Sequence, residues 1–289
     1  MKIPILNKRR RIILFCVLSL FFASCISLFS WVKHNDNRIE RTQYTLASAR
    51  LPAAFNGFRI AQVSDLHNDT LGDGHESLLS LLREAQPDMI AVTGDLIDSR
   101  TPDTEIALQF IQKALQIAPV YYVTGNHEIA LYTLYPQFER ELRNAGVAVL
   151  NNETVLLEQD GQSIALAGLS DPNTETLTSE ERIAFMRENT RQYYTVVLSH
   201  RPELFDEYCT AEADAVLTGH AHGGQFRLPF VGGLYAPGQG LLPQYDAGLF
   251  TSGSTDMIVS RGLGNSLFPF RVNNRPELAV IELKTDTVG

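Results

Sequence analysis

The sequence predicts an α/β domain built on mixed sheets, and three observations support this fold class. From Phe58 onward, short apolar runs alternate with helical patterns. After Gly219 the pattern changes to strand and turn signals with little helix. The composition, 44% hydrophobic and 20% charged, is typical of a folded chain and excludes a disordered, collagenous or coiled-coil protein.

The first element is an apolar segment, residues 12–32, which carries no charge. As a helix rising about 1.5 Å per residue it would span roughly 31 Å, close to the thickness of the hydrocarbon core of a bilayer. The basic residues 8–11 precede it. The positive-inside rule therefore predicts a single-pass membrane anchor, with residues 1–11 in the cytosol and the folded domain outside the cell membrane.

Two other interpretations of this segment stay open. A basic region before an apolar stretch is also typical of an export signal, and residues 22–25 weakly resemble a lipoprotein cleavage site. The adjacent arginines weakly resemble a twin-arginine signal. A buried helix of a soluble protein is the third interpretation. Residues 33–57 are expected to be a polar linker, and residues 58–289 one folded domain.

Strands and helices are expected in turn along this domain. Short apolar runs, most of them rich in Val, Ile, Tyr or Thr, predict strands at 58–64, 88–93, 120–124, 163–168, 195–199, 214–218, 256–260 and 278–283. Helices are expected at 76–85, 102–118 and 136–145, and a further one begins after Thr178. Thr101 before Pro102 is typical of a helix start, Gly146 of a helix end, and Thr178 with Glu181 of a capping box.

Charge is divided unevenly along the chain. Residues 1–57 hold 9 of the 24 Lys and Arg and 2 of the 33 Asp and Glu, which leaves 15 basic and 31 acidic residues, a balance of −16, for the domain. A domain this acidic is poorly suited to hold long nucleic acid, because that binding requires clustered Lys and Arg. Cys209 is its only cysteine, so no disulfide can close within it.

Residue types that bind metals follow five of the predicted strands directly. These segments are Ser64-Asp65-Leu66-His67, Gly94-Asp95, Gly125-Asn126-His127-Glu128, Ser199-His200 and Gly219-His220-Ala221-His222. Residues that leave neighbouring strand ends converge, and side chains two apart in extended chain point the same way. The glycines would let the backbone turn sharply before each polar side chain. One such pair is weak evidence, whereas five together predict one metal centre.

The ligand types narrow both the metal and the reaction. Carboxylate, imidazole and amide groups without thiolate suit Mn²⁺, Fe or Zn²⁺. Two divalent ions held by only two carboxylates, Asp65 and Asp95, would form a cationic pocket, which suits an anionic substrate. Two such ions about 3.5–4 Å apart would lower the pKa of bound water. They would also hold the attacking and the leaving oxygen during a displacement at phosphorus.

These five segments, in this order, resemble the motifs of the calcineurin-like metallophosphoesterase superfamily. Residues 219–225, 260–264 and 271–277 are similar to its membrane-associated or exported bacterial branch, and Ala221 replaces a usual Thr that is not a ligand. The resemblance implies a four-layer α/β/β/α sandwich of two mixed sheets. It also implies that Asp65, His67 and His222 hold one divalent ion, that Asn126, His200 and His220 hold a second, and that Asp95 bridges them.

The same resemblance implies two catalytic residues that are not ligands. His127 would face the substrate, stabilise the transition state and help to protonate the leaving oxygen, and Asp98 would orient His127. The other interpretation of Asp98 is an aspartate that caps its own loop. Hydroxide between the two ions would attack a phosphomonoester, phosphodiester or pyrophosphate, so the predicted protein is a phosphoester hydrolase.

The substrate is left open by the sequence. A phosphorylated lipid or another cell-envelope compound would suit an enzyme outside a membrane, and a nucleotide phosphodiesterase would use the same centre. The residues Leu263, Leu267, Phe268 and Phe270, interleaved with Arg261 and Arg271, would form a rim for an amphiphile or, alternatively, a strand edge and core. The alternative of a different class is a non-catalytic, membrane-anchored domain that keeps metals for structure.

Overall fold

Two mixed six-stranded sheets form the body of the protein, as a computed structural model that describes residues 8–36, 38–174, 177–265 and 268–286 shows. In spatial order the first sheet contains β1 (Glu40–Ser48), β16 (Glu277–Thr285), β2 (Arg59–Val63), β3 (Met89–Thr93), β4 (Val120–Val123) and β5 (Ala148–Val149). The second contains β14 (Gly248–Ser252), β15 (Thr255–Val259), β9 (Ala215–Thr218), β8 (Thr195–Leu198), β7 (Gln162–Gly168) and β6 (Glu153–Gln159). All eight predicted strands are confirmed, with small differences at their ends.

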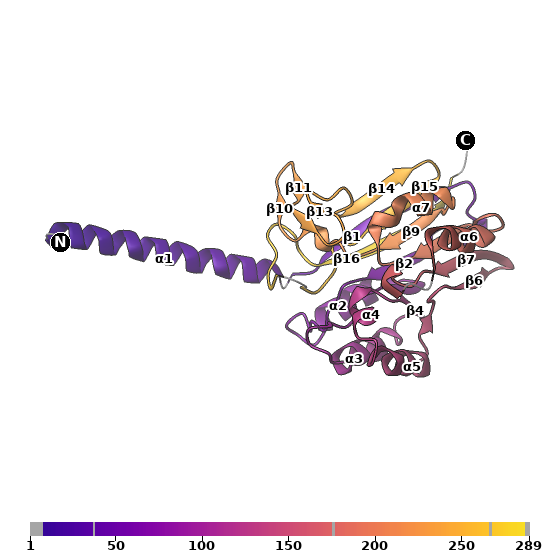
Figure 1. Cartoon of the computed structure of the whole chain (residues 1–289), viewed down its shortest axis with the longest axis horizontal. Helices are drawn as coiled ribbons and strands as arrows, with labels where there is room; N and C mark the ends of the chain where they lie inside the picture. The colour runs from indigo at the N-terminus through magenta and orange to yellow at the C-terminus, as the bar shows by residue number, and fades with distance from the viewer. Residues whose placement is uncertain (1–7, 37, 175–176, 266–267, 287–289) are drawn as a thin grey trace.

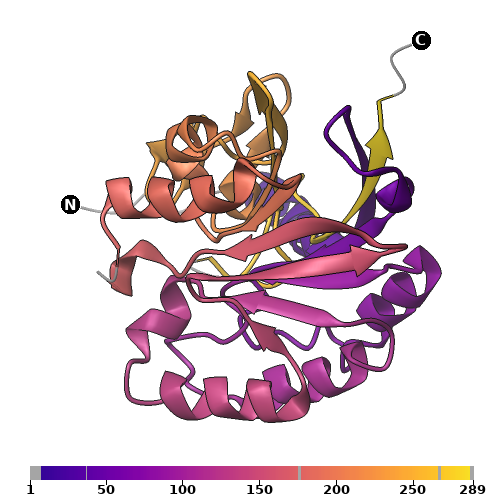
Figure 2. The ribbon, with the colours of Figure 1, turned by 90° about the vertical axis from the view of Figure 1, so that its right-hand side faces the viewer.

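Helices cover the outer face of each sheet (Figure 2). The first sheet packs against α2 (Glu76–Ala85), α3 (Glu105–Ala114) and α5 (Tyr135–Ala145), and the second against α6 (Ser179–Thr190) and α7 (Phe205–Thr210). Side chains on opposite faces of a strand enter different apolar cores. In β2, Val63 packs with the helices, whereas Ile60 faces the core between the sheets. The mixed α/β fold with two facing sheets is therefore confirmed.

Two predicted helix ends agree with the structure. The Thr178 hydroxyl accepts a hydrogen bond from the Glu181 amide, and the Glu181 side chain accepts one from the Thr178 amide, which completes the capping box of α6. Gly146 ends α5 with a φ of 104°, a conformation that only glycine adopts without strain.

Helix α3 is shorter than the predicted 102–118. Thr101 forms an isolated bridge with Asp98, and the Asp103 carboxylate accepts a hydrogen bond from the Glu105 amide, so the chain turns before the helix begins at Glu105. The helix start predicted at Thr101 is wrong, because Thr101 is engaged with the loop that follows β3. This loop also carries Asp98.

Part of the segment expected to be a linker is strand β1. It runs parallel to β16 from the pair Glu40 and Glu277 to the pair Ser48 and Thr285. Along β1 only Leu46 is buried, and every second side chain is exposed, so a mostly polar edge strand was not recognised in the sequence. The folded domain therefore begins before residue 58.

Helix α1 (Lys8–Asp36) extends away from the sheets (Figure 1). Apolar side chains along it, including Phe15 and Leu20, are more than half exposed. Within the part of the chain that the structure describes, no helix combines the length and the apolar character that crossing a bilayer requires. The predicted transmembrane helix is thus not supported.

The chain after β9 forms two small hairpins, as the turn-rich pattern after Gly219 predicted. They are β10 (Arg227–Leu228) with β11 (Gly232–Gly233), and β12 (Tyr235–Ala236) with β13 (Gly240–Leu241). The remaining elements are α4 (Asn126–Ala130) and the 3₁₀ turns η1 (Ala53–Phe55), η2 (Pro172–Thr174), η3 (Pro202–Leu204) and η4 (His222–Gly224).

Candidate metal centre

The predicted metal-binding residues come from five strand ends and lie together. Asp65 and His67 follow β2, Asp95 follows β3, Asn126 opens α4 after β4, His200 follows β8, and His220 and His222 follow β9. Six of them belong to groups of side chains whose ligand atoms lie within 4.8 Å of one another. Both sheets therefore contribute to one site at the ends of their parallel strands.

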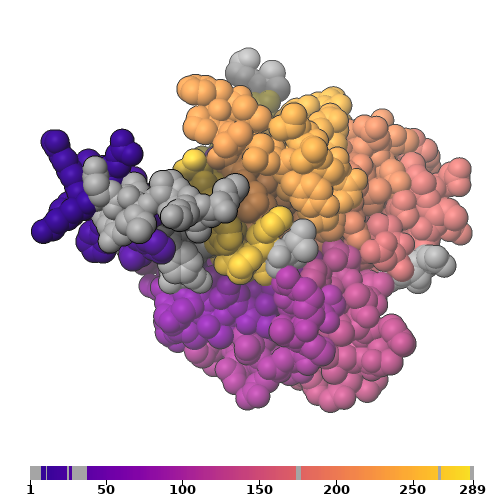
Figure 3. All heavy atoms as spheres, turned by 60° about the vertical axis from the view of Figure 1, so that its left-hand side comes forward, coloured from indigo at the N-terminus to yellow at the C-terminus, as the bar shows by residue number. Residues whose placement is uncertain are grey.

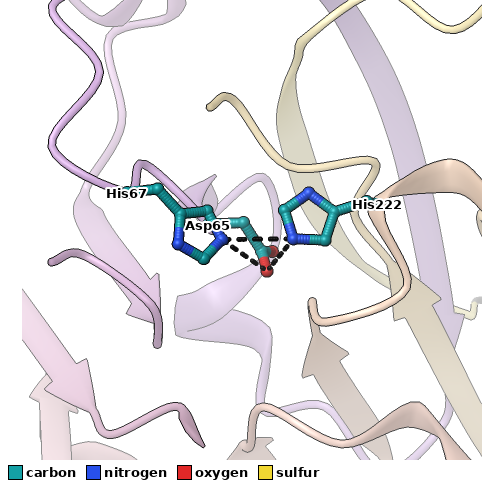
Figure 4. A group of neighbouring side chains, drawn as sticks. All are labelled: Asp65, His67 and His222. Atoms are coloured by element: carbon teal, nitrogen blue, oxygen red, sulfur yellow. Dashed lines mark hydrogen bonds and ion pairs between the residues drawn. The ribbon is translucent and has the colours of Figure 1, made fainter. Parts of the chain in front are cut away.

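The first group contains Asp65, His67 and His222 (Figure 4). The Nε2 atoms of the two histidines are 3.1 Å apart, and His222 Nε2 lies 3.3 Å from Asp65 Oδ1. Two imidazole nitrogens that face each other can share only one proton, whereas a cation between them would accept a lone pair from each. These three side chains could hold one divalent ion.

The second group contains Asp95, His200 and His220. His200 Nε2 lies 3.1 Å from Asp95 Oδ2 and also 3.1 Å from His220 Nδ1. The same Asp95 oxygen is 3.7 Å from His67 Nε2 in the first group. Asp95 therefore lies between the two groups, where a carboxylate could bridge two ions.

Asn126 supplies a further test of whether a metal fits. Its Oδ1 atom is buried and has no hydrogen-bond partner among the residues that the structure describes. Buried acceptors normally have a partner, so an orphaned amide oxygen on the residue next to His127 requires an explanation. An oxygen ligand to a hard or borderline cation provides one, and the donor set as a whole fits divalent metal ions.

The charges in the two groups depend strongly on one another. Burial alone would lower the pKa of His200, but the nearby Asp95 carboxylate raises it to about 10. Burial raises the pKa of Asp65 to about 6 and lowers the pKa of His67 to about 3. Burial also lowers the pKa of His220 and His222. Most of these imidazoles are thus neutral, the form that binds metals.

Backbone strain is concentrated at the same residues. Left-handed φ values, between 48° and 64°, occur at Asp65, His67, Asp95, His220 and His222. Such conformations cost of order 1 kcal/mol or more for residues other than glycine and tend to cluster at functional sites. The fold therefore holds these side chains in place at an energetic cost.

The sequence suggested that Gly125 allows a sharp turn, but the structure gives another reason for glycine at this position. Its φ of −104° is ordinary. A Cβ atom at this position, however, would lie 2.2 Å from Asp95 Oδ1. Gly125 is thus required for space beside the carboxylate, whereas Gly94, with a φ of 87°, has the left-handed conformation that was expected.

His127 forms a third group with His67 and Asp95, whose ligand atoms also lie within 4.8 Å of one another, so it lies beside the other two groups. The Ser99 amide donates a hydrogen bond to its Nδ1 atom at 3.0 Å, and Asp98 Oδ1 is 3.2 Å from the same atom. Asp98 also accepts hydrogen bonds from the Arg100 amide and from the Arg100 guanidinium. Both interpretations of Asp98 therefore agree with the geometry, because it caps its loop and contacts His127.

Glu128, which belongs to the Gly125–Glu128 motif but received no role from the sequence, joins two of the ligand loops. Its buried carboxylate accepts hydrogen bonds from the amides of Asp95, Ile97 and Gly125. Burial and the Asp95 charge raise the pKa of Glu128 to about 7. Glu128 thus fixes the loop after β3 against the loop after β4.

Arginines surround the site, and sequence reasoning missed two of them. Arg201 Nη1 lies 2.8 Å from His220 Nε2, and the Arg201 guanidinium also donates to Asp171. Arg100 contacts Asp98, and Arg271 Nη2 lies 3.4 Å from His222 Nδ1. The contacts of Arg201 and Arg100 cannot be recognised in the sequence, because these contacts depend on loop conformation. Arg201 and Arg100 offset the charge of the neighbouring carboxylates Asp171 and Asp98.

The predicted rim is only partly present. Leu263 is buried in the core beneath the first sheet, and Arg271 is buried against the site. Leu267 lies outside the described residues. Phe268 and Phe270 are each 37% exposed and pack around Phe226. The rim interpretation is therefore wrong for Leu263 and still applies to the two phenylalanines.

Two facing sheets with buried aspartate, asparagine and histidine at their strand ends define a metal-dependent hydrolase. Residues 58–224, more than half of the chain, match the family model described as calcineurin-like phosphoesterase. The chain belongs to the calcineurin-like phosphoesterase family. It is a metal-dependent phosphoric ester hydrolase, and the family implies divalent metal ions.

Three similar proteins illustrate the range of relatives. The Bacillus subtilis metallophosphoesterase YkuE is 31% identical over 86% of this chain and 86% of its own length. The Escherichia coli phosphodiesterase YaeI is 28% identical over 78% of this chain and 82% of its own length. A Danio rerio transmembrane protein with a metallophosphoesterase domain is 27% identical over 81% of this chain and 55% of its own length.

Proposed function

We propose that this protein hydrolyses a phosphodiester with two divalent metal ions, in the site formed by the seven residues from five strand ends. The observation that carries the proposal is their convergence around Asp95, whose Oδ2 atom lies within 3.7 Å of a histidine from each group. The orphaned Asn126 oxygen supports a second ion. The group around Asp65 has three ligands of its own, and Asn126 would add a ligand to the group around His200.

In this proposal Asp65, His67 and His222 hold one ion, Asn126, His200 and His220 hold the other, and Asp95 contacts both. When bound, the ions supply an activated water and neutralise charge on the phosphoryl oxygens. Mn²⁺, Fe and Zn²⁺ suit this donor set. Glu128 keeps Asp95 and Asn126 in register by accepting three backbone hydrogen bonds from their loops.

His127 provides the proton for the leaving oxygen. The Ser99 amide donates to Nδ1, so the ring proton of neutral His127 is on Nε2, the nitrogen that is free to meet the substrate. To act as an acid, the ring must first take a second proton on Nδ1; that N–H would donate to Asp98 Oδ1, 3.2 Å away, in place of accepting from the Ser99 amide, and Arg100 holds Asp98 in position. Asp98 is thus a positioning residue, and His127 is the catalytic acid.

The proposed substrate is a small or lipid-linked phosphodiester. Two divalent ions held by only two carboxylates, Asp65 and Asp95, would favour an anion, and the acidic balance of the domain disfavours a long nucleic acid. The name of YaeI as a phosphodiesterase supports a diester over a monoester. A small nucleotide diester would fit the same chemistry and is the second candidate.

The test is turnover by full-length protein stripped of metal and then reloaded with Mn²⁺, Zn²⁺ or Fe²⁺. Bis(p-nitrophenyl) phosphate should be hydrolysed faster than p-nitrophenyl phosphate, and Asp95→Asn should abolish both activities. Asp160→Asn, in the exposed turn between β6 and β7, is the matched control and should behave as the parent. Equal turnover by Asp95→Asn, or faster turnover of the monoester, would contradict the proposal.

Membrane attachment through α1, with the domain outside the cell, is a separate proposal. It is supported by the uncharged residues 12–32, by the exposed apolar side chains on α1, and by the relative that is a transmembrane protein. Alkaline washing of cell membranes tests it, since an integral protein stays with the membrane and a peripheral one is released. External protease should then degrade the domain in spheroplasts, whereas protection would place it in the cytosol.

A further inference from the structure

An apolar patch lies on the two hairpins that follow the metal centre. Its members are large apolar residues with exposed side chains: Leu228, Phe230, Val231, Leu241 and Leu242. Phe230 is fully exposed, and Leu241 and Leu242 are 81% and 63% exposed. Their three chain segments are hydrogen-bonded neighbours, because the Leu242 amide donates to Leu234 O and the Leu234 amide donates to Phe226 O. The chain segments that carry the patch are thus adjacent.

Charge and backbone conformation both set this region apart. Residues 228–245 contain no charged side chain, although 20% of the whole chain is charged. Phe230 and Leu242 also have left-handed φ values of 66° and 54°. An apolar residue that is both exposed and strained contributes little to folding, so a binding partner explains it better than stability does.

The hairpins are joined rigidly to the metal centre. The Leu234 amide also donates to the carbonyl of Gly224, which ends η4, the turn that begins at His222. A Cβ atom on Gly224 would lie 2.3 Å from Gly233 Cα, so the two backbones are in direct contact. Asp246 closes the base by accepting from the Gly233 amide and from Arg227. Whatever binds the patch therefore comes close to the metal centre.

The hairpins lie at the end of the domain from which α1 extends. Figure 1 shows β10, β11 and β13 at this end, and Figure 3 shows the orange hairpin residues on the same face as the indigo α1. If α1 lies in a bilayer, the hairpins that carry the patch are at the end of the domain nearest to it. A bilayer also accepts projecting apolar side chains of any shape, whereas a protein partner needs a matching pocket for each.

We propose that this apolar patch docks into the headgroup and upper acyl region of a lipid bilayer and presents the metal centre to phosphodiesters at the membrane surface. The proposal rests on the membrane attachment and phosphodiesterase activity proposed above. The absence of charge in residues 228–245 suits it, because a segment without carboxylates of its own is not repelled by an anionic lipid surface.

Tryptophan quenching in full-length protein tests the docking directly. The chain has one tryptophan, so Trp31→Phe with Phe230→Trp leaves a single probe in the patch. In vesicles of phosphatidylcholine and phosphatidylglycerol, bromine on the acyl chains near the glycerol should quench this probe about twofold, as expected for insertion by 5–10 Å. Trp31→Phe with Tyr132→Trp is the control, because Tyr132 is 79% exposed but lies in the turn between α4 and α5, away from the patch, and should not be quenched.

The possible outcomes distinguish failure of the docking from failure of the membrane attachment or of the phosphodiesterase activity. Protein that floats with the vesicles while the probe at position 230 stays unquenched would overturn the docking and leave the attachment intact. Protein that neither floats nor shows quenching would overturn both. A blue-shifted, concentration-dependent emission without vesicles would show that a second copy covers the patch. Leu241→Trp gives an independent probe, and turnover of bis(p-nitrophenyl) phosphate shows that each variant is folded.

Discussion

The metal centre and the apolar patch depart from the usual distribution of side chains in opposite ways. Asp65 and His200 are charged or polar and fully buried, whereas Phe230 and Leu241 are apolar and exposed. Each arrangement costs free energy unless a partner compensates, cations in the first case and an apolar surface in the second. The two regions are joined through Gly224, but their partners differ in chemistry, so substitutions can affect one and spare the other.

The largest expected effect comes from removing the shared carboxylate of the centre. Asp95→Asn should bring turnover of bis(p-nitrophenyl) phosphate below detection and weaken metal retention by more than about 100-fold, since even outer residues of metal sites change affinity by 10–100-fold. Elemental analysis after dialysis measures the metal. Full metal content in this variant would show that Asp95 is not a ligand.

His127→Ala should lower turnover by about 10²–10⁴-fold and leave both metals bound, because it removes a proton donor and no ligand. The loss should be smaller for a p-nitrophenyl diester than for one with an alkyl leaving group, whose oxygen needs the proton more. An equal loss with both substrates would contradict the acid role, and loss of metal would make His127 a ligand.

Metal binding should stabilise the fold. At a free ion concentration of 100 times Kd, the gain is about 2.7 kcal/mol, which corresponds to a rise in Tm of roughly 5–10 °C. Burial raises the pKa of Asp65 to about 6 in the metal-free protein, so below that pH a proton occupies the carboxyl and the ion must displace it. The rise should therefore shrink as the pH falls through 6, and a rise that does not change between pH 5 and 8 would argue against Asp65 as a ligand.

A substitution outside both regions gives a baseline for ordinary stability. Thr178→Ala removes the capping hydroxyl of α6 and should cost about 1 kcal/mol, or roughly 2–4 °C in Tm. Turnover of bis(p-nitrophenyl) phosphate should stay unchanged. A large loss of turnover would mean that α6 is coupled to the metal centre.

The smallest effect is expected from the patch. Phe230→Ser combined with Leu241→Ser exchanges two exposed side chains and should change neither Tm nor turnover of a soluble diester by a measurable amount. Calorimetry and the soluble assay check this. A fall in Tm would show that the patch is packed in solution, and a fall in soluble turnover would place it in the active site.

The clustering of these polar side chains could be predicted because metal-ligand chemistry restricts residue type and the strand ends restrict position; their role as ligands stays a prediction. Asp65, Asp95 and His200 follow apolar runs directly, and the structure places all three together. Arg201 and Glu128 could not be assigned, because their partners are fixed by loops whose conformations have no simple sequence signal.

Burial of apolar residues was harder to predict than the clustering of the polar side chains. Leu263 and Phe230 both occur in turn-rich sequence after Gly219, yet the first is buried and the second is exposed. Period-two alternation identifies a strand face only where the strand is long enough, and β10 and β11 contain two residues each. Strand β1 was missed for a related reason, since Leu46 is its only buried residue.

The long ladder between β1 and β16 limits how far the hydrolase domain can travel from α1. Only residues 37–39 separate the end of α1 at Asp36 from the start of β1 at Glu40. Fully extended, three residues reach about 10 Å, so the domain must stay close to the end of α1. If a surface holds α1, the candidate metal centre can reach only substrates near the point of attachment. More distant substrates must diffuse to the metal centre.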